Sequence, residues 1–330
     1  MKNYVDAGGV FRTSTDSSMN NNTSNKRFDP TAIVSDTPRS RWQYIARTVS
    51  SVVVSLMGIN RGGYLATEFA QAVVPIAKIE TAHGTLLCRS GHGRLRWRAE
   101  TFHTEEPDTI GWLDTLRPED VLWDVGGNVG LYSLYAAKFK GCKVFSFEPE
   151  AQNFALLVEN VALNEVGDRC FPACLAISKN PGIGRLKNRV ITKGGSHNFF
   201  YSTDHEFSEI EGRLPQSARG KGHVVEQIVF GVSLDELMHQ KDIALPTHLK
   251  VDVDGLEPEI ICGAQALLQD KTLRSILIEV NSLVEDHAQI PHVLKSYGFA
   301  LESQRSNWES RENREREAEM PATNMIFCRS

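Results

Sequence analysis

The stretch that decides the fold is Val121-Leu122-Trp123-Asp124-Val125-Gly126-Gly127-Asn128-Val129-Gly130. Its first half is a compact apolar run, which predicts a buried β-strand over Val121–Val125. Its second half is a Gly-x-Asn-x-Gly loop, in which the glycines and Asn128 suit left-handed backbone conformations. Leu131–Lys138 follows with helical spacing. The sequence therefore predicts a strand, a tight loop and a helix in immediate succession.

The same alternation of strands and helices continues along the chain. Apolar runs predict strands at Lys143–Phe147, Cys170–Ile177, Leu249–Val253 and Ser275–Val280. Helical spacing predicts helices at Thr109–Leu116, Phe154–Leu163, Leu234–Met238, Pro258–Leu268 and Ile290–Ser296. Two further strands, Phe299–Ser303 and Asn324–Cys328, suit a terminal hairpin. Strands that alternate with helices indicate an α/β, doubly wound and mostly parallel sheet covered on both faces.

Composition divides the chain into segments. Residues 1–40 are rich in Ser, Thr, Asn and Asp, and burial cannot offset the entropy of ordering them, so we predict a disordered tail. Residues 41–107 are predicted as an N-terminal extension, helical over 41–72 and then β-like at Pro75–Glu80, Thr85–Cys88 and Leu95–Ala99. Residues 108–330 form the main domain. Its segment 183–232 breaks the alternation, which fits a substrate loop and a surface elaboration without chemistry equally well.

Composition and charge narrow the classes of function. Apolar residues make up 41% and charged residues 23% of the chain, as in ordinary globular proteins. A net charge of -5 gives no reason to expect nucleic acid or an anionic membrane as a partner. The 6 cysteines form no C-x-x-C pair, and most lie in apolar runs, so we expect buried thiols and a reducing cytoplasm. The first forty residues lack the apolar region of a secretory signal, and no metal-ligand spacing is evident.

Two acidic residues stand at the ends of neighbouring predicted strands. Asp124 precedes the glycine loop, and Glu148, followed by Pro149, ends the next strand. An acid at the second position accepts hydrogen bonds from ribose hydroxyls in Rossmann-like folds. A dinucleotide site uses G-x-G-x-x-G, and the Asp124 carboxylate would repel a pyrophosphate. The pair predicts a site for S-adenosylmethionine, which is cationic and carries no phosphate; in the alternative interpretation both are merely polar strand ends.

The sequence resembles the FkbM family of class I S-adenosylmethionine-dependent methyltransferases over about residues 80–300. The resemblance rests on the loop just described, on Phe147-Glu148-Pro149 and Asn160–Asn164, on Glu106-Pro107-Asp108-Thr109 with Trp112, on Ala176-Ile177-Ser178, on Ser233–Leu237, on Lys250–Glu257 and on Gly263-Ala264. It implies a seven-stranded Rossmann-like sheet with an antiparallel last strand. It also implies O-methyl transfer to sugar or polyketide-type hydroxyls, in glycan or natural-product synthesis.

Two positions depart from the family pattern. The family loop usually reads Gly-Ala-Asn, and we expect Gly127 only to add flexibility. The fourth-strand motif usually reads Asp-x-Glu-Gly, whereas this chain has Asp254, one methylene shorter. If that acid takes part in the chemistry, its reach has changed.

The predicted cofactor-binding residues lie in the loop and around it. They are Asp124, Gly126, Asn128, Gly130, Glu148, Pro149, Ser178, Glu106 and Thr109. An alcohol acceptor must lose a proton, which invites a general base. The candidates are Asp252, Asp254 and Glu257, because crowded carboxylates raise one another's pKa, and His197 in its glycine-rich loop. Alternatively, Asp252 orients the cofactor, Asp254 and Glu257 cap the following helix, and His197 is simply exposed.

Three functions remain open at this point. The first is methylation of a small-molecule or glycan acceptor. The second is a nucleotide-dependent oxidoreductase on a similar sheet, which the loop spacing disfavours. The third is a catalytically silent relative that binds a partner, which the shorter Asp254 leaves open. The acceptor and the oligomeric state do not follow from the sequence.

Overall fold

The structure is a computed structural model of the chain. It describes residues 75–91, 93–188, 194, 199–202, 225–253, 255–281, 285–306 and 322–329, with short runs between 48 and 68. The predicted tail 1–40 and most of the predicted helix 41–72 lie outside the described residues, and the described positions between 48 and 68 are helical. Within the described part of the chain, no helix has the length and apolar character needed to cross a membrane.

A seven-stranded sheet forms the centre of the fold. Its strands, in spatial order, are β12 (Phe299–Ser306), β13 (Ala322–Arg329), β11 (Ser275–Asn281), β10 (His248–Val251), β3 (Val121–Val125), β4 (Lys143–Phe147) and β5 (Cys170–Ala173). Neighbouring strands from β11 to β5 pair in parallel, whereas β13 is antiparallel to both β11 and β12. The predicted Rossmann-like sheet with an antiparallel last strand is confirmed.

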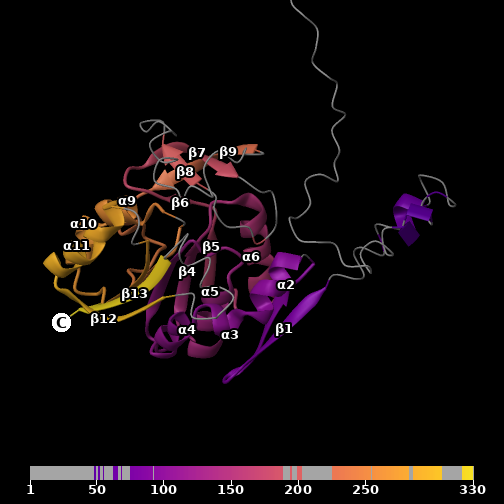
Figure 1. The fold of residues 1–330 in the computed structure, drawn as a ribbon, viewed down its shortest axis with the longest axis horizontal. Helices are drawn as coiled ribbons and strands as arrows, with labels where there is room; N and C mark the ends of the chain where they lie inside the picture. Colours follow the sequence, from indigo (N-terminus) through magenta and orange to yellow (C-terminus); the bar gives the residue numbers. More distant parts are fainter. Residues whose placement is uncertain are drawn as a thin grey trace, which may run out of the picture. The chain divides into compact units, whose positions relative to one another are not determined.

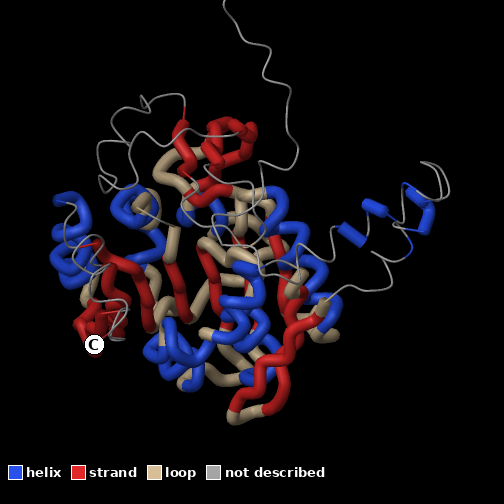
Figure 2. The backbone as a smooth tube through the Cα atoms, turned by 45° about the vertical axis from the view of Figure 1, so that its right-hand side comes forward, coloured by secondary structure: helices blue, strands red, loops and turns tan. Residues whose placement is uncertain are grey.

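Helices cover both faces of this sheet (Figure 2). Alternate strand residues enter two separate apolar clusters, Leu122 and Val144 in one and Trp123 and Phe145 in the other. The first cluster includes α4 (Pro107–Asp114), α5 (Leu131–Tyr135), the π-helical η1 (Ala136–Lys140) and α6 (Ala151–Leu163). The second includes α8 (Leu234–Leu237), α9 (Glu257–Cys262), α10 (Gln265–Gln269) and α11 (Ile290–Ser296), which follows the 3₁₀ turn η3 (Glu285–Gln289).

The predicted helix Pro258–Leu268 is divided into α9 and α10. A Cβ at Gly263 would lie 2.8 Å from the backbone oxygen of Ser178, so this glycine permits a close contact between two segments. Asp235 of α8 stabilises the new helix start, because its carboxylate accepts hydrogen bonds from the N–H groups of Ala266 and Leu267, at 3.0 and 2.9 Å.

The N-terminal extension contains a β-hairpin and short helices. β1 (Ile76–Thr81) and β2 (Gly84–Arg89) pair antiparallel, as predicted. The prediction of a strand at Leu95–Ala99 is wrong, because these residues lie in α2 (Gly93–Glu100), which leads through α3 (Phe102–Glu105) into α4. Leu95 and Ala99 are the buried residues of α2. Figure 1 shows β1 and α2 beside each other at one side of the domain.

Strands of the segment 183–232, together with the short β6 before it, form a second, four-stranded sheet, labelled at the top of Figure 1. Its strands are β6 (Ala176–Ile177), β9 (Val225–Val232), β7 (Gly182–Asn188) and β8 (Phe199–Ser202). The single strand predicted at Cys170–Ile177 is therefore two strands, and β6 pairs with β9 rather than with the central sheet. β7 and β9 lie at the two ends of the segment 183–232.

The thiols are only partly as predicted. Cys88, Cys142 and Cys170 are buried, Cys174 and Cys262 are exposed, and Cys328 is intermediate. Burial raises the pKa of Cys88 to about 11. The buried thiols are therefore held in their uncharged, unreactive form.

Candidate functional site

The glycine loop is held between the ends of three neighbouring strands. The N–H groups of Gly126 and Gly127 both donate to the Phe147 carbonyl of β4, at 3.0 Å. Gly126 has a φ of 84°, and a Cβ there would lie 1.8 Å from the backbone oxygen of Asp252. Only glycine therefore lets the end of β10 approach the loop so closely. Asn128 takes the predicted left-handed conformation, with a φ of 49°.

Glu148 closes the loop from the tip of β4. One of its carboxylate oxygens accepts a hydrogen bond from the Asn128 N–H at 2.8 Å, and the other accepts one from the Glu150 N–H, also at 2.8 Å. Both oxygens of this carboxylate are therefore engaged by backbone N–H groups at the loop. Glu148 thereby accepts the hydrogen bond of a loop N–H group that, in a dinucleotide site, would bind a phosphate.

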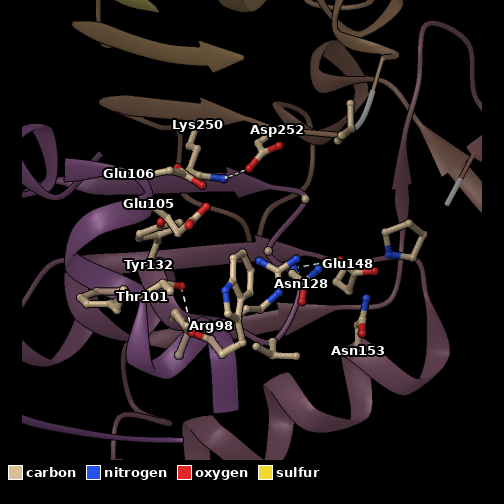
Figure 3. A pocket seen from close by; sticks show the side chains of 18 residues that line it. Arg98, Thr101, Glu105, Glu106, Asn128, Tyr132, Glu148, Asn153, Lys250 and Asp252 are labelled. Atoms are coloured by element: carbon tan, nitrogen blue, oxygen red, sulfur yellow. Dashed lines mark hydrogen bonds and ion pairs between the residues drawn. The ribbon is translucent and has the colours of Figure 1, made fainter. Parts of the chain in front are cut away.

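A cavity of about 150 Å³ opens above this loop. Figure 3 shows the side chains that surround it. The described residues that line it are Trp97, Arg98, Thr101, Phe102, Glu105, Glu106, Gly126, Gly127, Asn128, Val129, Leu131, Tyr132, Glu148, Pro149, Asn153, Lys250, Asp252 and Val253. Four of them are carboxylates and two are cationic, so the lining carries an excess of negative charge.

Asp124 is not among the lining residues. It is 1% exposed and lies beneath the loop, where its carboxylate accepts a hydrogen bond from the Ser133 hydroxyl. Lys250, the neighbour of Asp124 in the register of β3 and β10, places its ammonium 3.5 Å from the Asp124 carboxylate and 3.2 Å from that of Asp252. Burial lowers the pKa of Lys250, but Asp252, Asp124 and Glu106 outweigh burial and raise it above its ordinary value. Lys250 therefore stays charged and links Asp124, beneath the loop, to Asp252, in the cavity wall.

Glu106 lines the cavity at the start of α4. Thr109 and Asn324 donate hydrogen bonds to its carboxylate, at 2.8 and 3.2 Å. The Tyr132 hydroxyl also bonds to this carboxylate. Burial, and then the charge of Asp252, raise the pKa of Glu106. The predicted residue Thr109 is fully buried and supports Glu106 rather than lining the cavity.

Glu257 holds the loop that follows β10. Its carboxylate accepts hydrogen bonds from the N–H groups of Val253 and Gly255, at 2.9 and 3.0 Å, and lies 3.5 Å from the His287 ring. The Asn281 N–H donates to Nδ1 of His287, so Nε2 carries the proton and bonds to the Gly255 carbonyl at 3.3 Å, beside Glu257. Glu257 is fully buried and is not among the lining residues. Its position therefore fits the structural alternative that the sequence left open.

The remaining predicted residues are placed as follows. Gly130 lies against Leu157 of α6, and Ser178 bonds to the Asn180 carbonyl at 2.7 Å, so neither lines the cavity. Asp254 and His197 lie outside the described residues. Among the described residues, no group of three or more His, Cys, Asp or Glu could hold a metal ion.

Sequence reasoning missed several lining residues, above all Lys250, Tyr132 and Arg98. A signal for Lys250 was present, because a lysine inside a buried parallel strand requires carboxylate partners. Arg98 was missed because its helix was predicted as a strand.

The family model for the FkbM methyltransferase domain matches residues 124–301, which is more than half of the chain. The chain belongs to the FkbM methyltransferase family. The match begins inside β3, so this FkbM methyltransferase builds its cavity partly from residues that precede the matched region, including Arg98 and Glu106.

Similar proteins agree with this membership. The hexuronic acid methyltransferase AglP of Haloferax volcanii is 25% identical over 189 residues, which cover 57% of this chain and 67% of the relative. The 31-O-demethyl-FK506 methyltransferase FkbM of Streptomyces tacrolimicus is 26% identical over 204 residues, covering 56% and 75%. The solved structure of P. horikoshii TYW2 with MeSAdo aligns at 13% identity with a TM-score of 0.38, over 67% of this chain and 61% of that one. A TM-score of 0.38 is too low to support an inference about this chain.

Proposed function

We propose that this FkbM methyltransferase transfers the methyl group of S-adenosylmethionine to a hydroxyl of a sugar or other small molecule, in glycan or natural-product synthesis. The observation that carries the cofactor assignment is the position of Glu148. Its carboxylate lies on the Asn128 N–H at 2.8 Å, so negative charge already occupies the place that a pyrophosphate needs. A carboxylate at this strand end also suits the two hydroxyls of a ribose as a hydrogen-bond acceptor.

The other acids in the cavity suit the amino-acid end of the cofactor. Glu106 and Asp252 line the cavity on the side of Lys250 (Figure 3). An ammonium and a sulfonium are stabilised by such carboxylates, whereas a phosphate is repelled. The sequence predicts this role for Asp124, whereas Glu106 and Asp252 are the acids that line the cavity, and we assign the role to them.

The residues of the chain would act by positioning and by proton transfer. Bound S-adenosylmethionine supplies an activated methyl group on a good leaving group. The walls of the cavity would hold the acceptor hydroxyl in line with that methyl group. Glu106 is a stronger base than an ordinary carboxylate, because burial and the charge of Asp252 raise its pKa. We propose Glu106 or Asp252 as the group that takes the hydroxyl proton, with Asp254 and His197 remaining predicted candidates.

The names of the relatives support the class of acceptor. AglP is named for a hexuronic acid, and FkbM of Streptomyces tacrolimicus for 31-O-demethyl-FK506. Both names fit a small oxygen-bearing acceptor rather than a nucleic acid. The proposal includes a cytoplasmic location, which rests on the unpaired thiols.

Isothermal titration of the full chain with S-adenosylhomocysteine tests the cofactor assignment. We expect binding that weakens at least about tenfold in Glu148→Ala, since the ribose hydrogen bonds are lost. Glu150→Gln is the matched control, because Glu150 is a neighbouring buried acid that caps α6 through the Asn153 N–H and does not line the cavity. Binding of NAD in place of S-adenosylhomocysteine would favour an oxidoreductase. Tight binding without methyl transfer to any panel of glycans and metabolites would favour a silent relative.

A further inference from the structure

Helix α2 contributes one wall of the cavity from outside the region that defines the family. Trp97 and Arg98 of α2, with Thr101 just after it, line the cavity, and residues 124–301 are the matched region. Figure 3 places Arg98 and Thr101 on the side of the cavity opposite Lys250 and Asp252. The α2 wall therefore lies across the cavity from Asp252, one of the acids that the proposed function assigns to the ammonium of the cofactor.

Arg98 is the second cation of this cavity, and it forms no ion pair with a carboxylate among the described residues. Lys250 lies within 3.5 Å of both Asp124 and Asp252, whereas no ion pair among the described residues involves Arg98. The Arg98 side chain is held in place through its Nε, which donates to the Gly194 carbonyl at 3.1 Å. The terminal nitrogens of a guanidinium held this way can bind one planar anion through two hydrogen bonds.

Trp97 offers an aromatic surface next to this charge. It is 46% exposed although it is large and apolar, and it lines the same cavity. A pyranose ring has an apolar face of C–H groups, which packs against an exposed aromatic ring. An aromatic platform beside an arginine thus fits a sugar that carries an acidic group.

We propose that Trp97 and Arg98 form the acceptor subsite, and that the acceptor is a glycoside bearing a carboxylate or phosphate. This inference rests on the proposed function, because it places the acceptor relative to the cofactor. The carboxylate of the cofactor shares a carbon with its ammonium, so an ammonium at Glu106 and Asp252 keeps that carboxylate at the far side of the cavity from Arg98. The anion that Arg98 binds is then part of the acceptor.

The test measures sugar binding to the full chain saturated with S-adenosylhomocysteine, by saturation-transfer NMR titration. The probes are methyl β-glucuronide, glucose 6-phosphate and the neutral methyl β-glucoside. We expect an acidic probe to bind about tenfold or more tightly than the glucoside. Arg98→Gln should abolish this preference, and Arg98→Lys, which keeps the charge, should restore part of it. Trp97→Ala should weaken the acidic and the neutral sugar alike.

Arg96→Gln is the matched control, because Arg96 lies on the same helix, is 72% exposed in its side chain and pairs with Glu100. It should leave the preference unchanged. Equal binding of acidic and neutral probes to the wild type overturns the inference, as does the same loss in Arg96→Gln. If Arg98→Gln weakens S-adenosylhomocysteine binding tenfold, Arg98 belongs to the cofactor site and the inference fails while the proposed function stands. If the wild type binds no S-adenosylhomocysteine at all, the proposed function itself fails.

Discussion

The departure of Gly127 from the family's usual alanine has a structural cause that can be tested by mutation. A Cβ at Gly127 would lie 2.1 Å from the Ser146 hydroxyl oxygen, where ordinary contact begins at 3.4 Å. Ser146 is fully buried on β4, and its hydroxyl lies 2.9 Å from that of Ser133. The Ser146 hydroxyl thus occupies the space of the missing methyl group. The expectation that Gly127 only adds flexibility is therefore wrong, because the residue makes room for a neighbour.

Gly127→Ala should destabilise the protein by about 1–3 kcal/mol, since the hydroxyl must move by about 1 Å within a packed interior. Ser146→Ala alone should cost about 1 kcal/mol, because it removes a buried hydrogen bond to Ser133. In the double variant the new methyl group fills the space left by the hydroxyl. Its cost should stay near that of Ser146→Ala, about 1 kcal/mol, rather than reach the additive value of roughly 3 kcal/mol.

Urea unfolding of the four proteins, followed by tryptophan fluorescence, gives the free energies for this cycle. The m-value should be the same in all four, which shows that the same surface unfolds. Additive free energies would refute the reasoning, and so would a Gly127→Ala variant as stable as the wild type. Either result would mean that the loop and Ser146 do not compete for one space.

Three further predictions follow from the buried charges. S-adenosylhomocysteine should bind more tightly as pH rises through the raised pKa of Glu106, because only the ionised carboxylate attracts an ammonium; titrations should show proton release, which Glu106→Gln removes. Lys250→Met should destabilise the protein by about 3–5 kcal/mol in urea unfolding, and Asp124→Asn should recover part of this loss. Burial lowers the pKa of His248 from 6.5 to about 4, so the unfolded chain binds a proton first as pH falls. Up to roughly 3 kcal/mol of stability should therefore be present above pH 6.5 and lost as pH falls to 4, and His248→Gln should flatten this dependence.

The central sheet was predictable because buried parallel strands are short apolar runs with distinct boundaries.

The strand that the sequence predicts at Leu95–Ala99 is part of helix α2, and the spacing of the apolar residues explains this error. Leu95 and Ala99 are four residues apart, and that spacing puts two residues on one face in a strand and in a helix alike. Trp97 distinguishes the two, since a strand would place it beside Leu95 and Ala99, whereas it is 46% exposed. The sequence alone does not show whether the Trp97 side chain is buried or exposed.

The sequence predicts which residues end the strands beside the site, but not which of those residues face the cavity. Glu148 lines the cavity, and its position beside the loop follows from two consecutive strands. Asp124 does not line the cavity, because its register partner on β10 is Lys250, which lies more than a hundred residues further along the chain. Pairing across that distance is set by the packing of the whole sheet and is not visible in either segment alone.

The buried polar groups beneath the loop form one connected path from Gly127 to the cavity. Ser146 lies against Gly127 and bonds to Ser133, Ser133 bonds to Asp124, and Lys250 joins Asp124 to Asp252. Hydrogen bonds join the two serines to Asp124, and the charge of Lys250 compensates that of Asp124, so removal of one member would leave a buried polar or charged group without its partner. A change at Gly127 should therefore affect the cavity wall as well as stability. Gly127, where the loop departs from the family pattern, is therefore linked to the charged residues of the cavity wall through one network of buried polar groups.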